Sequence, residues 1–283
     1  MGMSSFDALL EEVVATMDMK GPYSAIEKLE ALKAEGNVEA TACLGRFYLQ
    51  GIGVIEDVET GVDLLEEAAN AGCPQADVSL GRLFLFGESL VSQDASKGIL
   101  HLEKAANAGL SEAMGILGDI YFYGYEGLET DPEKGLEWGM RAAKLGDITG
   151  HLICGDAYFY GTATAENIPL ATYHYREVLN AEPENTNVMC NLAVCLADPT
   201  DDQWVMPTQA DLVEALGLLS RAVELGDVRA HFNLGIHYAN GVGVDQDYDL
   251  AHHYIELAAN NGYEPAQEAL GSFRRTMRGK WTL

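Results

Sequence analysis

Positive charge is scarce in this chain of 283 residues, which carries 17 lysines and arginines against 44 aspartates and glutamates. The resulting formal net charge of −27 repels the phosphates of nucleic acids and the headgroups of anionic membranes. Neither is therefore expected as a partner, whereas a basic protein surface is compatible with the charge. A simpler explanation stays open, because charge of one sign also keeps an elongated surface soluble through self-repulsion.

Long apolar runs are missing as well, since no run approaches the roughly 20 residues of a membrane-spanning helix. Asp7, Glu11 and Glu12 interrupt the stretch from Phe6 to Met17, so we expect no secretory signal peptide. The five cysteines are odd in number and irregularly spaced, which is typical of buried thiols in a reducing compartment. These features together predict a soluble cytoplasmic protein.

Sequence signatures of catalysis are also absent. The chain contains no P-loop and no Gly-x-Ser-x-Gly elbow. The Gly-x-Gly segments at 51–53 and 241–243 follow expected helices rather than strands, which indicates turns and not dinucleotide loops. His252 and His253 are adjacent and face different sides of a helix, so they cannot chelate one metal ion as ligands four residues apart would. We predict a protein that is not an enzyme and binds no cofactor or metal.

What the chain does contain is one segment repeated about six times. Each copy centres on a small anchor residue, and the anchors are Gly45, Gly81, Gly118, Gly155, Ala193 and Gly235. Their spacing is roughly 36 to 38 residues, except for one longer interval near residue 200. A period of this length, built from two helices, indicates a solenoid whose units bury their apolar faces against one another.

The copy at 228–262 shows how one repeat is built. Gly235 has no side chain, so another helix can pass close to its backbone, and Tyr238 fills the space one turn further along. Gly241 permits a positive φ and ends the first helix. Asp247 is expected to cap the second helix, which ends in two alanines and a glycine. Short loops make the two helices antiparallel neighbours.

The pattern Ala-x4-Gly-x2-Tyr-x2-Gly-x-Gly-Val, followed by a helix ending in Ala-Ala-x2-Gly, resembles Sel1-like repeats, which are related to the tetratricopeptide repeat. The resemblance covers residues 22–275 and implies an all-α fold, a right-handed superhelical solenoid of antiparallel helix pairs with about six repeats and partial end units. We expect a capping helix in residues 1–21, a basic C-terminal tail at 276–283 and a long insertion at 198–208, after Ala193. The resemblance further implies a scaffold or adaptor role in protein complexes.

In the related tetratricopeptide pattern, the first helix of each pair lines the concave surface that binds ligands. Carried onto this chain, those positions place two cations and then two acids among aromatic side chains. The candidate partner-binding residues are Arg46, Arg82, Phe86, Asp119, Phe122, Tyr123, Asp156, Phe159, Tyr160, Ile236 and Asn240. This composition is common in peptide binding and favours a basic or mixed-charge partner with apolar anchors. Alternatively, Phe122 and Phe159 pack against the next first helix.

Trp204 lies in the insertion and is a candidate accessory contact, because long loops in compact arrays often carry function. Alternatively, it folds back over the fifth repeat. Two other functions stay open. An immunity protein that neutralises a basic toxin would use the same acidic surface. A hydrolase like the cysteine-rich Sel1-like proteins linked to β-lactams is less favoured. Those proteins carry a disulfide-paired cysteine in each repeat, and this sequence does not.

Overall fold

The computed structural model describes most of the chain in two compact units. The described residues are 5–87, 91–125, 127–197, 206–275 and 281–283. Trp204 and most of the predicted insertion lie outside them. One unit is formed by Met1–Gly150 and the other by His151–Leu283. Each unit is described by itself below.

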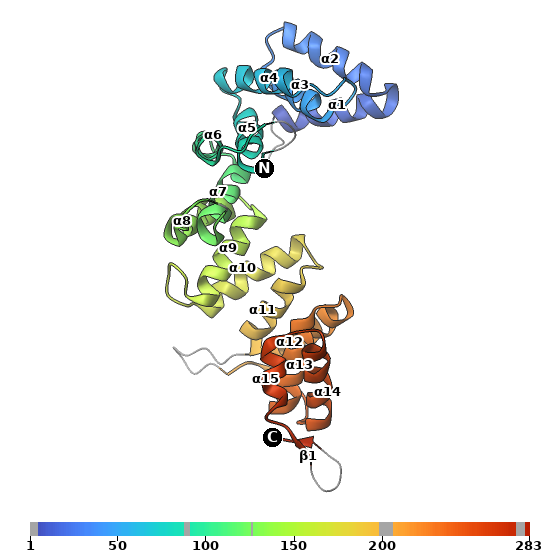
Figure 1. Ribbon diagram of the computed structural model, residues 1–283, viewed down its shortest axis with the longest axis vertical. Coiled ribbons are helices and arrows are strands. Elements are labelled where there is room, and N and C mark those ends of the chain that lie inside the picture. Colours follow the sequence, from blue (N-terminus) through green and yellow to red (C-terminus); the bar gives the residue numbers. More distant parts are fainter. Residues whose placement is uncertain (1–4, 88–90, 126, 198–205, 276–280) are drawn as a thin grey trace. The chain divides into compact units, whose positions relative to one another are not determined.

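Helices dominate both units, in the chain order labelled in Figure 1. The first eight are α1 (Ser5–Lys20), α2 (Pro22–Ala34), α3 (Val38–Gln50), α4 (Val58–Asn70), α5 (Pro74–Phe86), α6 (Ala95–Asn107), α7 (Ser111–Tyr123) and α8 (Pro132–Lys144). They are followed by α9 (Ile148–Tyr160), α10 (Ile168–Ala181), α11 (Thr186–Ala197), α12 (Gln209–Glu224), α13 (Val228–Asn240), α14 (Tyr248–Asn260) and α15 (Glu264–Leu270). The chain is thus an all-α repeat protein of helix pairs, as predicted.

In the first two repeats, the two helices approach closely because glycines face each other at the crossing. A Cβ atom added to Gly45 of α3 would lie 2.9 Å from the carbonyl oxygen of Gly61 in α4. A Cβ on Gly61 would lie equally close to the oxygen of Gly45, at 2.9 Å. Gly81 and Gly98 repeat this arrangement between α5 and α6, at 3.2 and 2.9 Å. The anchor glycines therefore permit the close helix approach that the sequence predicted.

Side-chain caps start the second helix of the repeats. Asp57 accepts a hydrogen bond from the Thr60 amide at 3.0 Å, and Asp247 accepts one from the Leu250 amide at 3.0 Å. Equivalent caps stand at Asp94, Asp131 and Asn167. Each satisfies an amide that the first helical turn leaves without an intrahelical partner. The cap predicted at Asp247 is confirmed.

The turn between the two helices requires a left-handed backbone. Gly53 and Gly243 adopt φ values of 71° and 73° at the same place in the first and sixth repeats. In the fourth repeat this place is held by Ala163, whose φ is 63°. A Cβ atom in the left-handed region crowds the backbone and costs about 1 kcal/mol or more. The fourth repeat therefore carries local strain that the other two avoid.

One buried or half-buried position, which we call the pair position, lies between the two helices of a repeat and carries side chains of varying chemistry. Asp77 of α5 lies 2.7 Å from His101 of α6, measured from Oδ1 to Nδ1. His151 of α9 lies 3.1 Å from His174 of α10, between their Nδ1 atoms. The corresponding residues elsewhere are Thr41 with Leu64, Met114 with Trp138, and His231 with Tyr254. Burial, together with the neighbouring His151, lowers the pKa of His174 to about 4.

The described end of the chain packs back onto α14. Strand β1 (Arg274–Arg275) pairs antiparallel with β2 (Trp281–Thr282). The Trp281 indole stacks on the His252 ring with the ring centres 3.7 Å apart, and its backbone amide donates to Asp249 at 2.9 Å. Stacking of an indole on an aromatic neighbour is favourable, which accounts for the position of Trp281, and residues 276–280 of the predicted tail lie outside the described residues.

Candidate functional site

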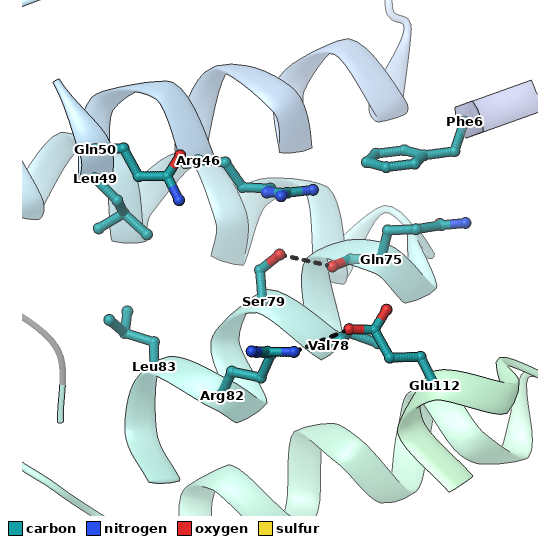
Figure 2. Close-up of a pocket in the computed structure, with 10 residues that line it drawn as sticks. All are labelled: Phe6, Arg46, Leu49, Gln50, Gln75, Val78, Ser79, Arg82, Leu83 and Glu112. Carbon is teal, nitrogen blue, oxygen red and sulfur yellow. Dashed lines mark hydrogen bonds and ion pairs between the residues drawn. The ribbon is translucent and has the colours of Figure 1, made fainter. Parts of the chain in front are cut away.

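Two of the candidate residues, Arg46 and Arg82, line a pocket of about 330 Å³ in the first unit. Its walls come from α1, α3, α5 and the first turn of α7. The lining residues are Phe6, Arg46, Leu49, Gln50, Gln75, Val78, Ser79, Arg82, Leu83 and Glu112. Figure 2 shows Arg46 and Arg82 extending from different helices, with Ser79 between them in this view.

The pocket contains more positive than negative charge. Arg82 Nη1 lies 3.2 Å from Glu112 Oε1, and their side chains are 51% and 58% exposed. Arg46 has no ion-pair partner within the part of the chain that the structure describes. Ser79 donates its hydroxyl hydrogen bond to the backbone oxygen of Gln75 at 3.0 Å. One guanidinium is therefore paired weakly and the other lacks a carboxylate partner.

Apolar side chains form the remaining walls of the pocket. Phe6, Val78 and Leu83 are buried, and Leu49 is half-buried. Phe6 comes from α1, where Leu9 and Val13 also pack into the core of the first unit. The arginines thus lie beside surfaces that exclude water on one side, and charge interactions are stronger there than in open solvent.

The aromatic candidates of the first unit differ in exposure. Phe86 of α5 and Tyr123 of α7 are 46% and 44% exposed. Phe122 is buried, with its ring edge-on to Tyr123 at a centre distance of 4.9 Å. Phe122 lies close to Gly135 of α8 in its own repeat, and its packing against the next first helix stays a prediction. Asp119 is exposed on the same helix, and partial desolvation raises the pKa of its carboxyl group.

In the second unit, the candidates Asp156 and Tyr160 belong to a polar network. Tyr175 donates a hydrogen bond to Asp156 Oδ1 at 2.7 Å, and Asn191 donates to the Tyr175 hydroxyl at 3.2 Å. Partial burial and the Asp156 charge raise the pKa of Tyr160, whose side chain is 60% exposed. Phe159 is half-buried between the rings of Tyr160 and Tyr175, at 4.7 and 6.0 Å. The network orders this surface but leaves Tyr160 accessible.

The two candidates from the sixth repeat lie on α13. Ile236 lines a smaller pocket of about 220 Å³ together with Val194, Ala197, Asn233, His237 and Val242. Asn240 is exposed at the end of the helix. The second unit therefore offers a mostly apolar hollow rather than a charged one.

Several pocket-lining residues were not among the sequence candidates. Gln75 and Glu112 each stand six residues before an anchor glycine, in the first turn of a first helix. Arg229 holds the same position in the sixth repeat and donates a hydrogen bond to Asn187 of α11 at 2.8 Å. Comparison of the repeats could therefore have identified this position from the sequence. It could not have identified Phe6, because Phe6 lies outside the repeated pattern.

Two further findings concern the described residues only. No helix among them combines the length and apolar character needed to span a bilayer. No group of three or more histidine, cysteine, aspartate or glutamate side chains in the described ranges is arranged to hold a metal ion. The cysteines are buried and are not joined by disulfides within the described residues, and burial raises the pKa of Cys43 to about 11 and that of Cys154 to about 12.

Similarity to known proteins covers most of the chain. The family described as Sel1 repeat matches residues 38–73, 74–110, 111–147, 151–177, 188–227 and 228–263. No curated protein matches the chain in sequence.

Solved structures share the fold. Similar structures include c5321, a protective antigen present in uropathogenic Escherichia coli strains that displays an SLR fold, with 28% identity, 87% coverage of this chain and a TM-score of 0.67. This chain spans 50% of the length of that protein. A Sel1 repeat protein from Oxalobacter formigenes is 24% identical, with coverages of 94% and 75% and a TM-score of 0.59. Immunity protein PA5088 from Pseudomonas aeruginosa is 20% identical, with coverages of 79% and 84%, and its TM-score of 0.46 is too low to support a functional argument.

Proposed function

Because this chain belongs to the Sel1 repeat family, whose members generally mediate protein–protein interactions, we propose that it is a non-catalytic scaffold. In this proposal, a protein or peptide partner binds along the first helices of the repeats. The candidate residues on those helices are the contact surface.

An aromatic side chain at one repeated position is the observation that carries the proposal. Phe86, Tyr123 and Tyr160 each stand five residues after an anchor glycine, in three consecutive repeats, and are 46%, 44% and 60% exposed. Burial against their own repeat therefore does not account for these side chains. Aromatic residues are enriched at the energetic centres of interfaces, since each buries about 150–250 Å² when covered.

The charges on the same helices indicate the character of the partner. The position directly after the anchor glycine is Arg46, Arg82, Asp119 and Asp156 in the first four repeats. A partner that matches this order has both signs of charge, with apolar side chains for the aromatic positions. The net charge of −27 also favours the approach of a partner that is basic overall.

Affinity purification of the tagged full chain from its native cells, followed by mass spectrometry, tests the proposal. We expect a stoichiometric partner that is lost when Tyr123 and Tyr160 are both changed to Ala. Loss of a central aromatic side chain typically costs about 2 kcal/mol or more, or about thirtyfold in affinity. Tyr23→Ala is the control, because Tyr23 is 66% exposed on α2 and holds none of the candidate positions.

Two results would contradict the proposal: repeated isolation of the protein alone, or equal recovery of the partner by the double variant. The identity of the partner separates a general scaffold from the immunity-type alternative. A basic toxin whose activity is blocked by the chain would identify the protein as a neutraliser.

A further inference from the structure

We propose that the pocket lined by Arg46 and Arg82 binds the carboxylate of an aspartate or glutamate side chain in the partner segment. This inference rests on the proposed scaffold function, because it assigns the chemistry of one partner residue. The pocket volume of about 330 Å³ lies at the lower end of the roughly 300–1,000 Å³ usual for ligand pockets, so it suits a side chain rather than a folded element.

Charge supplies the first argument. The chain has 44 acidic residues for its 17 basic ones, yet two arginines line this one pocket with a single glutamate. Arg46 lacks an ion-pair partner among the described residues, although acidic side chains are abundant. A guanidinium presents a planar set of N–H donors that matches the two oxygens of a carboxylate. An incoming carboxylate would supply the missing partner of Arg46.

The walls of the pocket supply the second argument. Phe6, Val78 and Leu83 are 5%, 4% and 2% exposed, so they form a dry boundary beside the arginines. A carboxylate bound against this boundary interacts with the half-buried Arg46 more strongly than with an arginine on open surface. Leu49, which is half-buried, would contact the aliphatic part of an aspartate or glutamate side chain.

Glu112 gives the pocket an internal competitor. Its contact with Arg82 is 3.2 Å long and exposed on both sides, and exposed ion pairs of this kind contribute little to stability. Arg82 carries five N–H donors, so it can share them between Glu112 and a second carboxylate. Glu112 nevertheless repels that second carboxylate. Its removal is therefore expected to strengthen binding, which a purely structural ion pair would not do.

The surroundings favour a side-chain carboxylate over the end of a chain. Phe86 stands one turn beyond Arg82 on the same face of α5 and is exposed. A partner segment that contacts both residues passes the pocket and continues toward Phe86. We therefore expect an acidic residue within a few positions of an apolar residue in that segment.

Selection of phage-displayed random peptides on the full chain provides the probes for a test. The selected peptides would be synthesised with blocked ends and titrated against the purified protein. We expect enriched sequences that pair an aspartate or glutamate with an apolar residue. Changing that acidic residue to its amide should weaken binding about tenfold to a hundredfold, the range for a charge-assisted hydrogen bond.

Three charge variants of the protein complete the experiment. Arg46→Gln should weaken binding about tenfold to a hundredfold. Glu112→Gln should strengthen it about twofold to fivefold, as expected for the loss of an exposed competing charge. Arg221→Gln is the matched control, because Arg221 is exposed on α12, does not line the pocket and makes the same change in net charge. Circular dichroism checks that each variant is folded.

The outcomes separate this inference from the proposed function. Peptides without an acidic residue, unchanged binding to Arg46→Gln, or a requirement for a free C-terminal carboxylate would overturn the inference and leave the scaffold function standing. Failure to select any peptide, combined with the absence of a partner from the native cells, would overturn both.

Discussion

Gly235 provides a strict test of how the helix pairs pack. A Cβ atom at this position of α13 would lie 2.5 Å from Ile255 Cγ1 and 3.1 Å from the Ala251 carbonyl oxygen in α14. Ile255 is 1% exposed and β-branched, so it cannot turn away. Overpacking of this kind costs about 1–3 kcal/mol of stability. Because its neighbours cannot move, we expect Gly235→Ala to cost the upper value, about 3 kcal/mol. The better helix propensity of alanine offsets about 1 kcal/mol, which leaves a net loss of about 2 kcal/mol.

A second glycine in the same unit is the control for this prediction. Gly217 lies in α12, and a Cβ atom there would meet no heavy atom within 4 Å. Gly217→Ala should therefore stabilise the protein by about 0.5–1 kcal/mol. Thermal and urea unfolding followed by circular dichroism measure both variants, and Gly235→Ala should lower the midpoint temperature by roughly 4–8 °C. If Gly235→Ala unfolds at or above the wild-type midpoint, the close-packing argument is wrong.

Two further stability predictions concern the fourth repeat. The pKa of His174 is about 4 in the folded state against 6.5 for the free side chain, so the unfolded state takes up its proton first. The free energy of unfolding should therefore begin to fall as the pH drops below 6.5. Near pH 4 the loss should reach up to about 3 kcal/mol. His174→Phe retains the aromatic stacking with Tyr158 and should flatten this part of the pH profile, and an unchanged profile would contradict the assignment. Ala163→Gly should raise the free energy of unfolding by about 0.5–1 kcal/mol in urea titrations by relieving the positive φ of 63°, and a loss of stability would refute the strain.

The repetitive part of the fold was predictable because each repeat places the same residue types at the same contacts between its two helices. The spacing of the anchor glycines predicted two helices per repeat, and the Gly235 crossing and the Asp247 cap follow directly from local chemistry. The ends were less predictable. Trp281 packs on α14 through contacts that no repeat contains, so periodicity carried no information about them.

The candidate site was predictable in its positions but not in its surroundings. Arg46 and Arg82 both hold the position after an anchor glycine, and they line the same pocket of the first unit. Sequence spacing could not show that Phe6 closes that pocket or that Phe122 is buried. Both depend on contacts between helices, which are set by three-dimensional packing rather than by local pattern.

The pair position has a consequence for how such a chain can change over evolutionary time. Its two residues lie on different helices of one repeat and contact each other, as Asp77 and His101 do. A substitution of one residue therefore changes which side chains are tolerated at the other. Duplication of a whole repeat carries both residues along. A recombination that separated the helices and set His101 against Met114 would leave a buried imidazole without its carboxylate, at a cost of about 1–3 kcal/mol. The viable breakpoints therefore lie between repeats, and the heritable unit is the intact helix pair.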